Sequence, residues 1–190
     1  MTGQRVIHNP ISGELITIRT RAEDTGGELL EWELVLAPGG RVPSSHAHPE
    51  QQERFTIVDG RLRLRVGGKR MVLGPGDSAT IPRGTVHSFA NAGTTPVRVN
   101  VETRPALAME ALLATAAELA RAQLTARRRL PNLVSLALFM REYAHEVRAP
   151  YLPAPFAELI TRSIAVVAGW FGLDLPYRRL RAGRDEPANA

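Results

Sequence analysis

The sequence predicts a mainly β fold followed by about three α-helices, with the change near Pro105. Before this residue, short runs rich in β-branched residues alternate with turns made of Gly, Pro, Asn and Asp. After it, Ala, Leu and Arg dominate, and the hydrophobic residues recur with a helical period. Many short strands at regular spacing are typical of an all-β barrel or sandwich. We therefore expect a β-barrel over residues 1–105, a helical extension over 106–181 and a disordered polar tail over 182–190.

Eight segments before Pro105 have the pattern of strands. The clearest is Leu62–Val66, where apolar residues occupy every second position. Asp59-Gly60 precedes it as a hairpin signal, and Gly67-Gly68 follows it as a second tight turn. The eight predicted strands cover residues 15–19, 29–36, 55–58, 62–66, 71–73, 79–81, 86–90 and 97–101.

Three segments after Pro105 have apolar residues at helical spacing. They cover about residues 106–129, 132–148 and 156–171. Pro131 separates the first two, and three prolines within 149–155 make that stretch a connector. We expect the apolar stripes of these helices to pack on the barrel or on a dimer partner, with a lid over the barrel mouth as the alternative.

Size and composition place the chain among ordinary globular proteins. Its 190 residues suffice for one domain with a full core, and 44% of them are hydrophobic and 23% charged. No apolar run reaches the ~18 residues that a membrane span needs, and residues 1–5 lead into no apolar signal segment. Because the chain has no cysteine, a metal site would have to use nitrogen and oxygen donors. We expect a cytoplasmic protein that contacts no membrane.

The positive charge of the chain does not indicate nucleic-acid binding. The net charge is +5 and the isoelectric point about 10.6, but most basic residues are spread out. The triplet Arg127-Arg128-Arg129 falls at the predicted end of a helix, where cations are favourable. No aromatic residues interleave with it and no recognition helix stands out, so we expect no nucleic-acid partner.

Three of the five histidines and one glutamate fall into two segments with turn residues at fixed spacing. The segments are Gly40-x5-His46-x-His48-x4-Glu53-x6-Gly60 and Gly76-x5-Pro82-x-Gly84-x2-His87-x3-Asn91. Three imidazoles and one carboxylate suit a divalent transition metal. A polar barrel mouth without a metal is the alternative.

The strand period places these candidate ligands beside apolar side chains. Residues two apart share a face, so His46 and His48 point to one side. Glu53 shares a face with Phe55 and Ile57, and His87 with Phe89. We take Phe55, Ile57, Phe89 and Trp32 as candidates for a substrate pocket, with core packing as the alternative. Glu50, His8 and His145 are expected at the surface, and Asn91 is expected to cap a turn.

The two segments are similar to the two conserved motifs of the cupin superfamily, with every spacing kept over residues 40–91. The chain resembles a small single-domain bacterial cupin of the quercetin-dioxygenase-like kind, with a helical C-terminal extension. This resemblance implies a double-stranded β-helix, the jelly-roll barrel, usually as a homodimer. It also implies that His46, His48, Glu53 and His87 bind one divalent transition metal ion, which could be Fe, Mn, Ni, Zn or Cu.

The resemblance implies a metal-dependent enzyme of dioxygenase type that acts on a small organic molecule inside the barrel. Glu53 would then be a metal ligand and, transiently, a proton acceptor. Isomerases and decarboxylases also occur in the superfamily. The alternative from a different class is a non-enzymatic module that binds or senses a small molecule.

Overall fold

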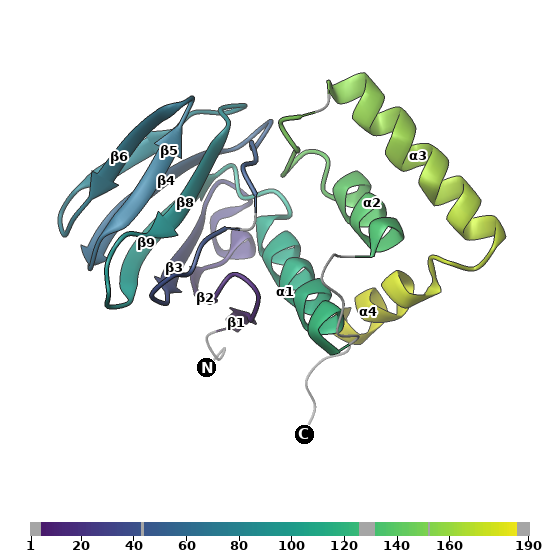
Figure 1. The fold of residues 1–190 in the computed structure, drawn as a ribbon, viewed down its shortest axis with the longest axis horizontal. Coiled ribbons are helices and arrows are strands. Elements are labelled where there is room, and N and C mark those ends of the chain that lie inside the picture. Colours follow the sequence, from purple (N-terminus) through teal and green to yellow (C-terminus); the bar gives the residue numbers. More distant parts are fainter. Residues whose placement is uncertain (1–4, 43, 126–131, 152, 186–190) are drawn as a thin grey trace.

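The β part of the chain forms two antiparallel sheets beside a group of helices (Figure 1). The computed structural model describes residues 5–42, 44–125, 132–151 and 153–185. The strands are β1 (Val6–Asn9), β2 (Glu14–Thr20), β3 (Leu30–Leu36), β4 (Gln52–Asp59), β5 (Leu62–Val66), β6 (Lys69–Leu73), β7 (Ser78–Ile81), β8 (His87–Asn91) and β9 (Val97–Arg104). One sheet has the order β1-β2-β3-β9-β4-β7 and the other β6-β5-β8.

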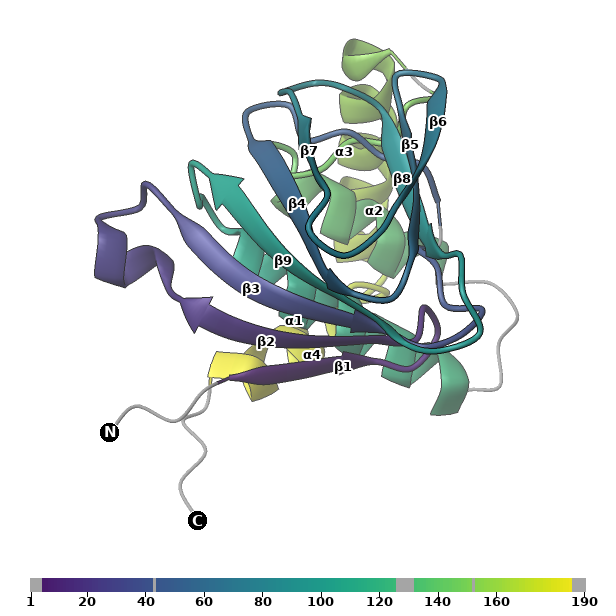
Figure 2. The same cartoon turned by 90° about the vertical axis from the view of Figure 1, so that its left-hand side faces the viewer.

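The two sheets curve around a shared apolar core (Figure 2). Leu34 and Phe55 come from the six-stranded sheet, and Leu64 and Phe89 from the three-stranded sheet. Burial alternates along β4 and β8, because neighbouring side chains of a strand point to opposite faces. The mainly β fold predicted from the sequence is confirmed.

All eight predicted strands are present, and two details differ from the prediction. The short strand β1 was not predicted; it pairs with β2 at the edge of the larger sheet. Asp59-Gly60 is a turn but not a hairpin, because β4 pairs with β7 and β9 while β5 pairs with β6 and β8. This turn carries the chain from one sheet to the other.

Among the described residues, the helical part contains one α-helix more than predicted. Its helices are α1 (Met109–Thr125), α2 (Leu133–Glu142), α3 (Ala154–Trp170) and α4 (Leu175–Asp185), and the short 3-10 helix η1 (Ala22–Thr25) lies between β2 and β3. The predicted second helix was too long, because the chain leaves α2 after Glu142 and Arg148 forms a β-bridge with Ala47. Residues 126–129, where the first helix was predicted to end, lie outside the described residues.

The predicted start of a disordered tail at residue 182 is wrong, because α4 continues to Asp185. Two contacts hold α4 on α2. The Tyr177 hydroxyl donates a hydrogen bond to Glu142 over 2.8 Å, and Arg181 forms an ion pair with the same carboxylate. The rest of the predicted tail, 186–190, lies outside the described residues.

Helix α1 joins the helical part to the β part. Met109 and Leu112 belong to the same core as the strands, and Glu110 forms ion pairs with Arg5 and Arg21. The strands end at Arg104 and the α-helices begin at Met109, on either side of the change seen in the sequence. The division into two domains at this point stays a prediction.

In the described ranges no single helix is long and apolar enough to cross a membrane, although the sharply bent pair formed by α3 and α4 meets that test by length and composition.

Two motif glycines allow the cost of backbone strain to be separated from the cost of a clash. Gly60 and Gly76 both have positive φ, of 79° and 86°. A Cβ at Gly60 would lie 2.8 Å from the carbonyl oxygen of Pro96 and from the Cα of Val97, whereas a Cβ at Gly76 meets open space.

We expect Gly76→Ala to lower the free energy of unfolding by about 1–2 kcal/mol, the cost of left-handed backbone. Gly60→Ala should cost about 1–3 kcal/mol more, because Ala also overlaps the backbone of residues 96 and 97. Urea unfolding of both variants measures the difference. Equal losses would contradict the close approach at Gly60.

Candidate metal centre

His46 and His87 are brought together by backbone pairing. The His46 amide donates to the His87 carbonyl over 3.0 Å, and the His87 amide donates back over 2.8 Å. Directly paired residues project their side chains to the same face, and the two ring centroids lie 4.3 Å apart. His87 opens β8, after a turn in which the Gly84 amide donates to the carbonyl of His48.

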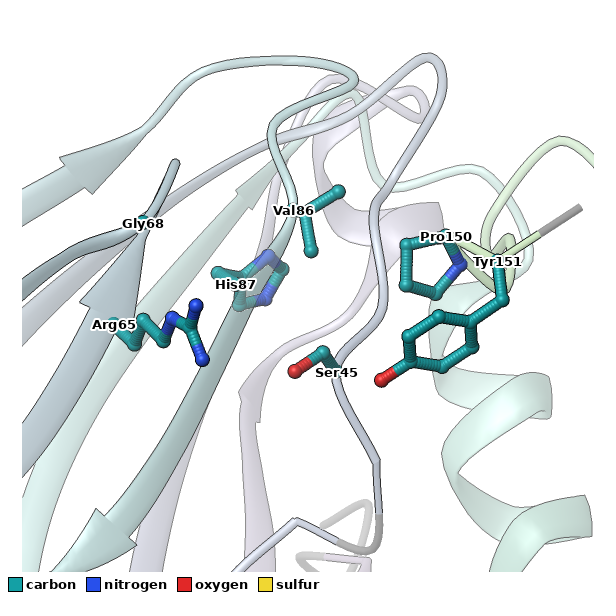
Figure 3. A pocket seen from close by; sticks show the side chains of 7 residues that line it. All are labelled: Ser45, Arg65, Gly68, Val86, His87, Pro150 and Tyr151. Carbon is teal, nitrogen blue, oxygen red and sulfur yellow. The ribbon is translucent and has the colours of Figure 1, made fainter. Parts of the chain in front are cut away.

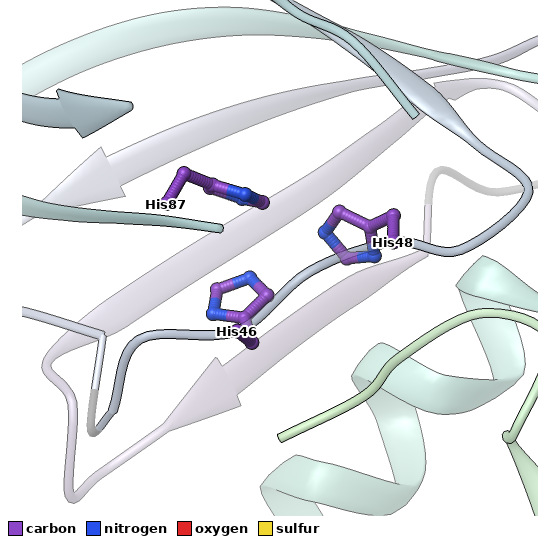
Figure 4. A group of neighbouring side chains, drawn as sticks. All are labelled: His46, His48 and His87. Atoms are coloured by element: carbon purple, nitrogen blue, oxygen red, sulfur yellow. The ribbon is translucent and has the colours of Figure 1, made fainter. Parts of the chain in front are cut away.

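His48 completes a cluster of three imidazoles (Figure 4). Its ring centroid lies 5.0 Å from that of His46 and 5.1 Å from that of His87. One ligand nitrogen from each histidine lies within 4.8 Å of the other two, which is close enough for all three to hold one metal ion. The spacing of the two sequence motifs predicted this cluster.

Glu53 lies beside two of the three histidines. One carboxylate oxygen, Oε2, is 3.3 Å from Nε2 of His48 and 3.3 Å from Nε2 of His87. Strand β4 places it there, because Glu53 faces inward with Phe55 and Ile57. Among the described residues, the group of ligand atoms mutually within 4.8 Å contains the histidines and not Glu53. The carboxylate therefore stands to the His48 and His87 side of the cluster.

Backbone carbonyls fix the orientation of all three rings. Nδ1 of His46 lies 3.2 Å from the carbonyl of Ser44, and Nδ1 of His87 lies 3.1 Å from that of Thr85. Nδ1 of His48 lies 2.5 Å from the carbonyl of Glu146, in the helical part of the chain. A carbonyl only accepts, so each Nδ1 carries a proton, and Nε2 is the nitrogen of each ring that is left to bind a metal ion when the ring is neutral.

The polar atoms of the cluster fit a divalent ion. His87 Nε2 is buried and has no hydrogen-bond partner among the described residues, although Glu53 Oε2 lies 3.3 Å away. Leaving a buried polar atom unpaired costs free energy, and coordination to a metal would satisfy this nitrogen.

The charges inside the cluster are strongly coupled. Burial of the His46 ring, together with the neighbouring His87 and His48, lowers the pKa of His46 to about 3. Burial opposes ionisation of Glu53, but the neighbouring His48 and His87 outweigh it and hold its pKa below the usual range. Burial also lowers the pKa of His48, but the Glu53 carboxylate and the Glu146 carbonyl outweigh it and raise that pKa. The site therefore keeps a buried carboxylate ionised, as a metal ligand must be.

Residues outside the two motifs support Glu53 and His48. The Trp32 indole donates to the Thr103 hydroxyl over 3.1 Å, and that hydroxyl lies 3.5 Å from Glu53 Oε1. Thr103 was missed by the sequence analysis, although it is a polar residue on the inward face of β9, next to Val101. The Glu146 carbonyl left no signal in the sequence, because any residue could supply it.

The predicted substrate-pocket residues lie in the core. Phe55, Ile57, Trp32 and Phe89 are all buried there, and none of them lines the pocket of about 220 Å³ that borders His87. That pocket is lined by Ser45, Arg65, Gly68, Val86, His87, Pro150 and Tyr151 (Figure 3). A role for the four core residues in substrate binding stays a prediction.

The remaining residues singled out by the sequence lie outside the cluster. His8 is exposed. His145 and Glu50 form an exposed ion pair with 2.6 Å between Nδ1 and Oε1. Asn91 holds a turn as expected: its side chain donates to the carbonyls of Leu36 and Thr95 and accepts from the amide of Gly93.

Comparison with known proteins gives matches in the β part. A family model described as "Cupin domain" matches residues 32–103. The chain is 35% identical over 78 residues to quercetin 2,3-dioxygenase of Bacillus subtilis, a match that covers 40% of this chain and 22% of the relative. It is 33% identical over 70 residues to the tetracenomycin polyketide synthase protein TcmJ of Streptomyces glaucescens, covering 37% of this chain and 46% of the relative.

Among solved structures, an RmlC-like cupin from Shewanella frigidimarina matches with a TM-score of 0.47 and 20% identity, covering 55% of this chain and 86% of that one. The chain spans less than half the length of the two curated relatives. The family match includes the four residues of the histidine and glutamate cluster. Residues 32–103 are therefore a cupin domain.

Proposed function

We propose that the protein is a metal-dependent enzyme of dioxygenase type that acts on a small organic molecule. The observation that carries this proposal is the cluster of His46, His48 and His87, whose ligand nitrogens lie within 4.8 Å of one another and whose rings are oriented by carbonyl contacts at Nδ1. The match to part of quercetin 2,3-dioxygenase supports the reaction type. A homodimer and a cytoplasmic location, which the cupin resemblance and the composition suggested, stay predictions.

The chain's own residues have distinct tasks in this proposal. His46, His48 and His87 would hold a divalent ion, and Glu53 would add one negative charge from the side of His48 and His87. Such an ion supplies Lewis-acid activation or, as iron, activation of oxygen. Glu53 Oε2 is also the carboxylate oxygen placed to hold a proton released from a substrate next to the cluster.

We infer the kind of substrate from the residues that line the pocket beside His87. The Arg65 guanidinium and the hydroxyls of Ser45 and Tyr151 point toward one another across it (Figure 3). Among the described residues no carboxylate lines this pocket, so its polar groups offer a positive charge and hydroxyl donors. Its volume of about 220 Å³ is below the range of about 300–1,000 Å³ for drug-sized ligands. We infer a small substrate with an enolate, phenolate or carboxylate oxygen.

A non-enzymatic module that binds a small ligand is the second candidate. The small pocket and the tightly filled core favour it, because they leave little room beside the histidines for both a substrate and a second reactant. The two candidates share the metal site and differ in turnover.

Replacing a proposed ligand tests the metal site. We expect His48→Ala to weaken binding of Fe(II), Mn(II) or Ni(II) at least about tenfold, which is about 1.4 kcal/mol, because one of three convergent nitrogens is lost. Metal content per chain after dialysis measures the effect. His8→Ala is the matched control and should keep the wild-type content, because His8 lies outside the cluster. Full metal content in His48→Ala would contradict the assignment.

The loop after α2 provides a test of how His48 is positioned. The carboxylate of Glu146 accepts a hydrogen bond from the amide of Ala108 over 3.1 Å, which fixes the residue whose carbonyl meets His48. We expect Glu146→Ala to weaken metal binding about 10–100-fold, as loss of a partner behind a metal ligand does. Glu146→Gln keeps an acceptor oxygen and should bind nearly as well as wild type. Calorimetric titration of metal into folded protein separates the two variants, and equal affinities would contradict the positioning role.

Oxygen consumption tests the reaction type. Protein loaded with Fe(II) without oxygen should consume oxygen when small enols or phenols are added, and Glu53→Gln should slow this by about 100-fold or more. The metal content of Glu53→Gln is measured in parallel, so that loss of metal is distinguished from loss of the proton acceptor. Ligand-induced shifts in melting temperature without turnover, for several metals, would replace the enzyme with the binding module.

A further inference from the structure

Helix α3 presents most of its large apolar side chains to solvent, whereas its protein-facing side is mainly alanine with the half-buried Ile164. Phe156, Leu159, Ile160, Val166, Val167 and Trp170 are all exposed, with Leu159 at 63% and Trp170 at 79% of their full exposure. The opposite side carries Ala168, which is buried, and Ala157 and Ala165, which are half-buried. Helix α3 packs on α2 and is the outermost element on the side away from the sheets (Figure 1). A helix normally faces its large apolar residues inward, so α3 has the pattern of a helix that a partner covers.

The exposed residues form one stripe centred on Ser163. These residues form three pairs placed symmetrically about Ser163. The offsets are three residues for Ile160 and Val166, four residues for Leu159 and Val167, and seven residues for Phe156 and Trp170. Offsets of three, four and seven residues return to the same face of a helix. Ser163 is itself exposed, so a small residue marks the middle of the stripe.

We propose that the protein forms a homodimer in which α3 pairs antiparallel with α3 of a second copy, about a two-fold axis that passes near Ser163. In this arrangement residue 156 meets residue 170 of the partner, 159 meets 167 and 160 meets 166, so every large apolar side chain faces another one. A two-fold axis requires such self-complementarity, and the symmetric spacing about Ser163 provides it. The small Ser163 side chains allow the helices to approach closely where they cross.

The size of the exposed face fits a stable dimer. The six side chains and Phe171, which follows the helix and is also exposed, present roughly 800 Å² of apolar surface per chain, given the 150–250 Å² of a full aromatic side chain. A standard interface buries about 800 Å² per partner, and an exposed apolar patch on a monomer is usually about 300–600 Å². The stripe carries no charge, because Glu158 and Arg162 lie to one side of it, so the net charge of +5 does not oppose contact there.

A membrane surface is the other class of partner for an apolar face, and the structure favours a second copy. Helix α4 continues from α3 at an angle of 94° and carries Arg178, Arg179 and Arg181 within its first two turns. Charged side chains are costly in the hydrocarbon region, so the two helices do not form a favourable pair of spans. Arg178 and Arg181 are moreover paired with Asp174 and Glu142, which leaves them less available to lipid headgroups.

A single introduced cysteine tests the two-fold axis. The chain has no cysteine of its own, and helices packed at about 8–10 Å bring facing Cα atoms within the reach of a disulfide. We expect Ser163→Cys in the full chain to form a disulfide-linked dimer under mild oxidation. Glu158→Cys is the control on the same helix and should stay unlinked, because two copies of residue 158 would lie about 15 Å apart along the pair.

Sedimentation equilibrium tests the dimer itself. Wild-type protein should approach twice its mass of 20.8 kDa, and Leu159→Glu should weaken the dimer about 100-fold or more, since the symmetry buries the new charge twice. An unchanged melting curve of the monomer shows that this exposed substitution leaves the fold intact. A monomeric wild type, a Leu159→Glu variant that still dimerises, or sedimentation of the wild type with phosphatidylcholine and phosphatidylglycerol vesicles instead of self-association would each overturn the proposal.

Discussion

The arrangement of the site depends on three contacts between histidine Nδ1 atoms and backbone carbonyls. Each contact orients one ring, and the three ligand nitrogens lie within 4.8 Å of one another. Without these contacts, either nitrogen of each imidazole could carry the proton in His46, His48 and His87. The unpartnered Nε2 of His87 and the ionised Glu53 lie beside these rings, and a cation bound there would satisfy both groups.

Two of these carbonyls are local and the third is not. Ser44 and Thr85 each lie two residues before the histidine that they orient, so the turn that delivers the ligand also sets its ring. The Glu146 carbonyl reaches His48 from 98 residues away, and the bridge between Ala47 and Arg148 holds the two segments together. The helical part thus supplies an element of the site that residues 32–103 lack. A cupin domain cut out of this chain would keep all four motif side chains and lose the fixed orientation of one of them.

The features predicted correctly from the sequence are those that depend on the strand period and on the spacing of the two motifs. Alternation located eight strands, and motif spacing located the three clustered histidines and the neighbouring Glu53, because both depend on local backbone geometry. Helix α4 was missed because its proline, Pro176, and its arginines do not give a clear helical pattern. The helix is stabilised by a tertiary contact, the hydrogen bond from Tyr177 to Glu142 of α2. The Glu146 carbonyl could not be predicted, since a backbone contact leaves no residue preference. The pocket beside His87 was missed for a related reason: Arg65 and Tyr151 are brought together by tertiary packing alone.

Helix α3 shows a different limit of sequence reasoning. Its residues are apolar around much of the helix, so the pattern predicts that the helix is buried but does not predict which element or partner it packs against. The structure resolves this, since α3 packs on α2 while most of its large apolar residues are exposed. Because α2 packs on α3 and leads directly into the loop that orients His48, the outer face and the metal site lie at opposite ends of one continuous packed unit. Covering α3 with a second copy would therefore stabilise α2 and, through residues 143–148, the position of the Glu146 carbonyl. The extension is thus better understood as part of the site's support than as an appendage to a complete barrel.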